Sequence, residues 1–97
     1  MKKSELVRIV SKKTGITNAK VSSVVDAFFE TLAEELIHGN RYAHEGFGSF
    51  SIKRKKDRVA RNPLTGEILK VDACYAPKFT PSKILKDRIK KIPLDDE

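Results

Sequence analysis

Residues 53–75 read KRKKDRVARNPLTGEILKVDACY, a stretch in which one turn separates two segments of extended character. The turn falls at residues 62–66, where proline suits the second position and glycine suits the end. Beyond it, Ile68, Leu69, Val71 and Tyr75 predict a second strand, so that Lys53 to Cys74 forms a long antiparallel hairpin. Its inner positions carry too many charges for a protein core. We therefore expect an arm over residues 53–75.

The first strand of this arm is strongly basic. Residues 53–61 hold six cations against one acid, whereas residues 17–38 hold one cation against four acids. The whole chain carries 20 Lys and Arg against 13 Asp and Glu, a formal net charge of +7. Such segregation indicates a binding surface for a polyanion. An edge strand protected from aggregation is the alternative, but it needs only one or two charges.

Two helices are predicted ahead of the arm. Ser4 suits the N-cap of the first helix and Gly15 its end, while Thr17 caps a second helix that Gly39 stops. The second helix has a broad apolar stripe, which we interpret as one face for its own core and another for a second subunit. The residues expected at the interface between subunits are Val25, Phe28, Phe29, Leu32, Phe47, Phe50 and Phe79.

The remaining segments complete one α+β domain. Strands around a turn are expected over residues 42–52, with the glycines of Gly46-Phe47-Gly48 at the turn and sheet crossing. Phe79 closes a last strand, and Pro81 suits the first turn of a short amphipathic helix that Pro93 ends. No repeat or linker divides the chain. The domain is expected to span residues 1–91, followed by an acidic tail over 92–97.

Several motifs together resemble one family. They are GFGSF at residues 46–50, Arg58, RNPLTGE at 61–67 and FTPSKILKD at 79–87, and they resemble the signature of the HU/IHF family over residues 1–91. The resemblance implies an intertwined dimer with a helical body capped by antiparallel sheets. Two β-ribbon arms would then hold double-stranded DNA through its minor groove and bend it.

The resemblance also assigns roles to individual residues. Pro63 corresponds to the residue that intercalates between base pairs, and Arg58, Arg61 and Asn62 to residues along the groove. Phosphate contacts on the arm and flanks are expected from Lys53, Arg54, Lys55, Lys56, Lys70, Lys3, Ser82, Lys83 and Lys86. The chain departs from the family pattern at Ala60 and Ser82, where glycine is common, and in its extension beyond residue 91.

These features favour a homodimeric, HU-like architectural protein with little sequence specificity and a preference for bent, nicked or gapped DNA. It would be cytoplasmic and nucleoid-associated, with no cofactor, metal, membrane or small-molecule substrate. An IHF-like, sequence-preferring DNA bender and a basic RNA-binding protein are the alternatives. An enzyme is disfavoured, because His38 and His44 with Glu45 fit no strong metal pattern and Cys74 has no evident partner base.

Overall fold

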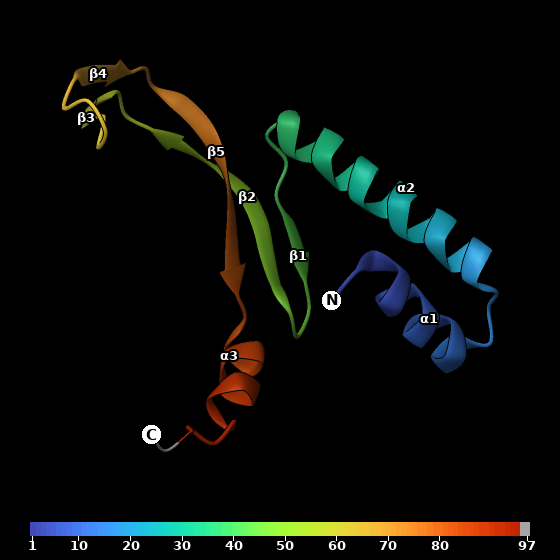
Figure 1. Ribbon diagram of the computed structural model, residues 1–97. Coiled ribbons are helices and arrows are strands. Elements are labelled where there is room, and N and C mark those ends of the chain that lie inside the picture. Colours follow the sequence, from blue (N-terminus) through green and yellow to red (C-terminus); the bar gives the residue numbers. More distant parts are fainter. Residues whose placement is uncertain (96–97) are drawn as a thin grey trace. The chain divides into compact units, whose positions relative to one another are not determined.

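The computed structural model describes residues 1–95 and combines helices with antiparallel strands, which confirms the α+β class (Figure 1). It divides into two compact units, Met1–Glu35 and Leu36–Glu97, and each is described by itself. The elements in chain order are α1 (Lys3–Thr14), α2 (Asn18–Ile37), β1 (Tyr42–His44), β2 (Gly48–Lys55), β3 (Arg58–Arg61), β4 (Ile68–Val71), β5 (Cys74–Pro81) and α3 (Lys83–Lys90).

The first unit is a pair of helices whose ends are set by local signals. Gly15 ends α1 in the left-handed conformation with φ 74°, and its N–H donates to the Ser11 carbonyl at 2.9 Å. The Thr17 hydroxyl accepts from the Lys20 N–H at 3.3 Å, as expected of the cap of α2. The expectation for Ser4 was wrong: Lys2 is the N-cap, because the Glu5 carboxylate accepts from its N–H.

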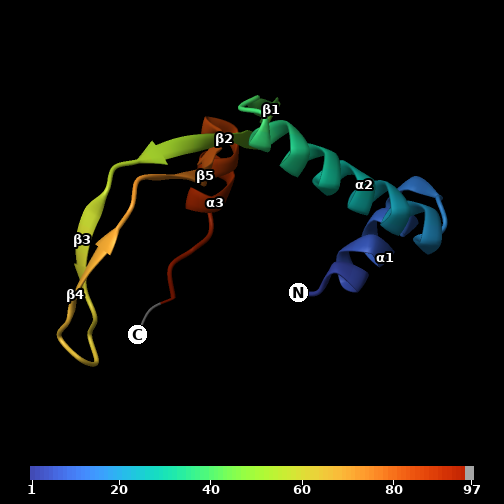
Figure 2. The ribbon, with the colours of Figure 1, turned by 90° about the horizontal axis from the view of Figure 1, so that it is seen from above.

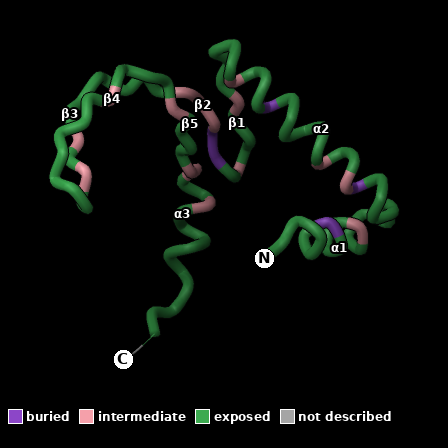
Figure 3. Tube along the Cα trace, turned by 45° about the horizontal axis from the view of Figure 1, so that its top comes forward, coloured by how far each residue is buried: buried purple, intermediate pink, exposed green. Residues whose placement is uncertain are grey.

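The core of the helical unit is small. Val7, Val21 and Leu32 are its buried apolar side chains, and they appear as isolated buried stretches along α1 and α2 (Figure 3). Among the described residues of the whole chain, no large side chain is fully buried. The two helices therefore leave much apolar surface in water.

The second unit is built on a three-stranded antiparallel sheet in the order β1-β2-β5. Its register places Phe50 opposite both Tyr42 and Phe79, and the Phe50 and Phe79 rings lie 4.9 Å apart. Gly48 is buried opposite Pro81, where a Cβ atom would be 2.5 Å from the Thr80 carbonyl oxygen. Only glycine fits this crossing, which confirms its predicted role.

The predicted hairpin is present, but it is not one continuous ladder. Strands β2 and β5 pair as far as Lys55 opposite Cys74, and β3 and β4 form a separate two-stranded sheet. Residues 56–57 and 72–73 interrupt the two strands between these sheets, and Figure 2 shows the ribbon bending there. Most described residues of β3 and β4 are exposed, so strand pairing contributes most of what holds this part, and a local bend can interrupt the ladder at low cost.

The last helix begins later than predicted. Pro81 is the final residue of β5, paired with Gly48, and is not in the first helical turn. Ser82 is the N-cap instead, because its hydroxyl accepts from the Leu85 N–H at 3.1 Å. Helix α3 then ends at Lys90, ahead of Pro93. Of the expected acidic tail, residues 96–97 lie outside the described part.

Candidate nucleic-acid interface

The tip of the ribbon is a loop fixed by Asn62. The Asn62 Oδ1 atom accepts from the Leu64 N–H at 2.9 Å, and the Asn62 carbonyl accepts from the Gly66 N–H at 2.8 Å. The Asn62 N–H in turn donates to the Glu67 carbonyl at 2.8 Å. Gly66 has φ 75°, the left-handed conformation that glycine adopts without strain. These bonds confirm the predicted turn and leave Pro63 exposed at the tip.

Strands β3 and β4 form the outer ribbon, and its cations lie on both of its faces. Arg58 is opposite Val71 and Arg61 is opposite Ile68, and residues three apart on a strand point to opposite faces. Lys70 is opposite Val59 and therefore shares the face of Arg61. All three cations are exposed, and none has an ion-pair partner within residues 1–95. Their charges are available to an external anion on either side.

The inner ribbon is the part of the arm formed by the ends of β2 and β5. It carries the other four arm cations, and all of them are exposed. Lys53, Arg54 and Lys55 lie at the end of β2, where they pair with Ala76, Tyr75 and Cys74, and Lys56 falls in the interruption. The structure thus gathers every predicted arm cation on one ribbon.

The sequence analysis did not anticipate that two acidic residues come together at the interruption. Asp57 and Asp72 line a hollow of about 260 Å³ together with Arg58 and Lys70. The two carboxylates come from opposite strands and place negative charge beside two of the arm cations. Only the strand register brings them together, so their separation in sequence hides the arrangement.

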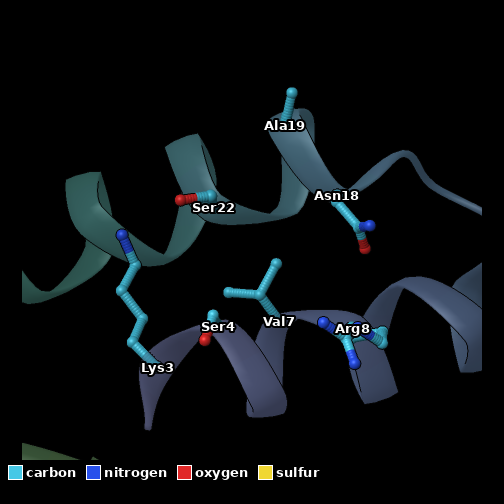
Figure 4. Close-up of a pocket in the computed structure, with 7 residues that line it drawn as sticks. All are labelled: Lys3, Ser4, Val7, Arg8, Asn18, Ala19 and Ser22. Carbon is cyan, nitrogen blue, oxygen red and sulfur yellow. The ribbon is translucent and has the colours of Figure 1, made fainter.

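Lys3 is engaged by an acid that the sequence analysis did not pair with it. Its ammonium group lies 2.7 Å from Asp26 Oδ1, with side chains 50% and 62% exposed. Both residues belong to the helical unit, and Figure 4 shows the Lys3 side chain reaching from α1 toward α2 beside Ser22. The phosphate contact expected of Lys3 would compete with this ion pair.

The predicted residues of the last helix lie at its start. Lys83 and Lys86 are exposed on the first turns of α3. The Ser82 hydroxyl already accepts the hydrogen bond of the helix cap. A contact of Ser82 with a phosphate would therefore have to form in addition to that bond.

The residues expected at a subunit interface are unequally exposed. Phe28 and Phe29 remain 44% and 58% exposed, with their rings in an edge-to-face arrangement 5.6 Å apart. Leu32 is buried within its own unit, and Val25 is intermediate. In the second unit, Phe47 and Phe79 are 45% and 42% exposed and Phe50 is half-buried. An apolar surface on α2 and another on the sheet are thus left uncovered.

The other reactive residues considered from the sequence include His44 and Cys74. Within the described chain, no group of three or more His, Cys, Asp and Glu side chains is placed to hold a metal ion. The ring of His44 lies 2.6 Å from the Tyr42 hydroxyl, and Cys74 is an exposed free thiol. The described helices include none that is long and apolar enough to cross a membrane.

A pair of helices followed by a sheet that extends into a basic two-stranded ribbon defines the class of small β-ribbon nucleic-acid-binding proteins. The model of the family described as "Bacterial DNA-binding protein" matches residues 1–90. The chain belongs to this family, the HU/IHF family, as its motifs predicted.

Individual relatives agree with that assignment. The chain is 45% identical over 89 residues to DNA-binding protein HRL18 of Rhizobium leguminosarum, covering 92% of this chain and 98% of that protein. It is 37% identical over 90 residues to DNA-binding protein HU of Geobacillus stearothermophilus, covering 93% and 100%. The structure matches a chain of an Anabaena HU–DNA cocrystal with a TM-score of 0.88 and 33% identity, covering 95% and 100%.

Proposed function

We propose that this protein is an architectural DNA-binding protein that acts as a homodimer and bends duplex DNA. Its arms lie in the minor groove, and Pro63 wedges between base pairs. One observation carries the proposal: an exposed proline stands at the tip of a hydrogen-bonded loop, at the end of a ribbon with cations on both faces. Membership of the family supports DNA as the partner.

The two faces of the ribbon suit the two walls of a groove. The minor groove is about 6 Å wide, with a phosphate strand on either side. Arg58 and Arg61 project from opposite faces, so each can reach a different strand. Arginine also suits a narrow groove of strong negative potential, because its planar guanidinium is weakly hydrated and loses less on partial burial than an ammonium.

The wedge depends on the rigidity of the tip. Pro63 has a fixed ring and no N–H to leave unpaired, and the three backbone-directed bonds of Asn62 already order its loop. Little conformational entropy is therefore lost when the ring enters a base step. Unstacking a step costs on the order of a few kcal/mol, and contacts that the bend permits can offset this cost. Lys3, Lys83 and Lys86 would supply such contacts on the flanks.

The uncovered apolar side chains support a dimer. A chain of 97 residues can bury only a modest core by itself. Phe29 on α2, Phe47 in the turn between β1 and β2, and Phe79 on β5 remain about half exposed, at 58%, 45% and 42%. A second copy of the chain would cover these surfaces and present a second arm.

Limited sequence specificity follows from what the arm offers. Minor-groove edges distinguish A·T from G·C but do little more, so recognition would depend chiefly on groove width and deformability. DNA that is already bent, nicked or gapped costs less to deform and should be preferred. An HU-like role in organising the nucleoid fits this behaviour better than an IHF-like, sequence-preferring role.

The proposal is tested by measuring the end-to-end distance of a labelled duplex of about three helical turns by energy transfer. The native protein should shorten this distance, and Pro63→Ala should bind with less shortening. Pro93→Ala, which removes a proline outside the arm, is the matched control and should behave as the native protein. Binding by the native protein without any shortening would refute the bending mechanism and leave a basic protein that coats DNA.

A further inference from the structure

The outer ribbon displays apolar side chains that the fold of the chain does not use. Leu64 is 93% exposed at the tip, and Val59 and Ile68 are 67% and 65% exposed on β3 and β4. A single exposed apolar side chain is ordinary in a soluble protein. Here, however, the most exposed of the three directly follows Pro63 in a segment otherwise rich in cations. Leu64 therefore contributes almost nothing to folding and is available to a partner.

The position of Leu64 is fixed by the same loop that presents Pro63. Its N–H donates to Asn62 Oδ1 at 2.9 Å, and on its far side the Thr65 hydroxyl accepts from the Glu67 N–H at 3.3 Å. Consecutive Cα atoms are about 3.8 Å apart across a trans peptide. A surface that receives the ring of Pro63 therefore lies within reach of the exposed Leu64 side chain.

This inference rests on the proposed function, in which that surface is duplex DNA. Arg58, Arg61 and Lys70 would then face the phosphates along a groove. In the minor groove every base pair presents acceptors, and a G·C pair adds the N2 amino donor of guanine. The Leu64 side chain has no atom that can accept this hydrogen bond.

We propose that Leu64 is a specificity-determining residue that disfavours G·C pairs beside the wedge. Burying the guanine amino group against Leu64 would leave a donor unpaired, and a buried unpaired polar group costs about a factor of ten in affinity. A·T and inosine·cytosine pairs lack this donor and accept the apolar side chain. The arm thus reads one feature of the groove with a side chain that makes no hydrogen bond.

The experiment compares binding to two duplexes of about three helical turns, alternating dG·dC and alternating dI·dC, by fluorescence anisotropy. They differ in the minor groove only by the amino group, and binding registers shifted by two base pairs are equivalent. Inosine pairs are also easier to deform, which by itself favours the dI·dC duplex. The quantity compared is therefore the change, from one protein variant to another, in the ratio of affinities for dI·dC and dG·dC.

Leu64→Gln supplies an amide oxygen that can accept from the guanine amino group. It should lower the preference for the dI·dC duplex about tenfold relative to the native protein. Leu94→Gln makes the same chemical change at a residue of equal exposure, 92%, outside the arm, and should leave the preference unchanged. Both variants should melt as the native protein does, since neither leucine is packed.

An unchanged preference in Leu64→Gln would overturn the inference, as would an equal fall in Leu94→Gln. Bending of the same duplexes by the native protein and by Pro63→Ala is measured separately, as the end-to-end distance. If Leu64→Gln leaves the preference for dI·dC unchanged while bending still depends on Pro63, only the role of Leu64 is refuted. Absence of Pro63-dependent bending instead refutes the proposed wedge.

Discussion

Removal of Arg58 and Arg61 should change how strongly DNA binding depends on salt. Both guanidinium groups are exposed, lie on opposite faces of β3 and have no ion-pair partner in the described chain, so each is free to displace counterions from DNA. Each phosphate neutralised on duplex DNA contributes about −0.9 to the slope of log K against log salt concentration. With two arms in the proposed dimer, a single alanine variant should reduce the magnitude of this slope by about 1.8, and the double variant by about 3.6.

The effect on affinity is large enough to measure directly. Over a fourfold rise in salt concentration, the native protein should lose about 150-fold more affinity than Arg58→Ala/Arg61→Ala. Fluorescence anisotropy titrations of one duplex at four or more salt concentrations give the slope. Lys12→Ala/Lys13→Ala, which removes two cations from the last turn of α1, is the charge-matched control and should retain the native slope.

Two outcomes would contradict this account of the arm. A double variant with the native slope would show that the ribbon does not contact phosphates. An equal fall in the slope for the α1 control would show that affinity follows net charge, without a defined interface.

Three further changes test other parts of the molecule. Asp26→Asn removes the carboxylate that pairs with Lys3 and should cost at most about 0.5 kcal/mol of stability in urea unfolding, because the pair is exposed. The variant should also bind long duplexes about two- to threefold more tightly. Lower affinity would exclude Lys3 as a DNA contact. Phe29→Glu places a charge on the exposed face of α2 and should prevent dimer formation in sedimentation experiments; a stable dimer would place the interface elsewhere. Gly48→Ala would set a Cβ atom 2.7 Å from the Phe79 ring and should lower the free energy of unfolding by about 1–3 kcal/mol; native stability would mean that β5 moves aside.

Local signals accounted for much of the fold. Gly15 and Thr17 mark the boundary between the first two helices because a left-handed C-terminal glycine and a hydroxyl cap act within one turn of the chain. The turn at residues 62–66 was predictable for the same reason. At the last helix, two local signals competed: Pro81 suits a first turn and Ser82 suits a cap. Pairing of Pro81 with Gly48 in the sheet decided in favour of the cap at Ser82.

Features that depend on residues far apart in the chain could not be predicted from the sequence. The ion pair of Lys3 and Asp26 joins positions 23 apart, and only the packing of two helices brings them together. The interruption of the ribbon at residues 56–57 depends on how two strands bend together, and composition does not encode it. The arm cations were identified from their density in residues 53–61, whereas the role of Pro63 came from the motif RNPLTGE, because its charge and periodicity alone indicate only a turn.

The interruption between the two sheets of the ribbon has a consequence for how the protein would leave DNA. The outer piece is held by the four residue pairs of β3 and β4 and by the hydrogen bonds of its tip loop, so it can move or open while the inner piece, paired over β2 and β5, stays intact. Contacts divided among separable pieces break one at a time, and a piece that has let go rebinds readily while the others hold it near. A competing molecule can occupy the vacated groove before that happens. Residence time would then fall as the concentration of competitors rises, so that crowded DNA would exchange its bound proteins faster than sparse DNA.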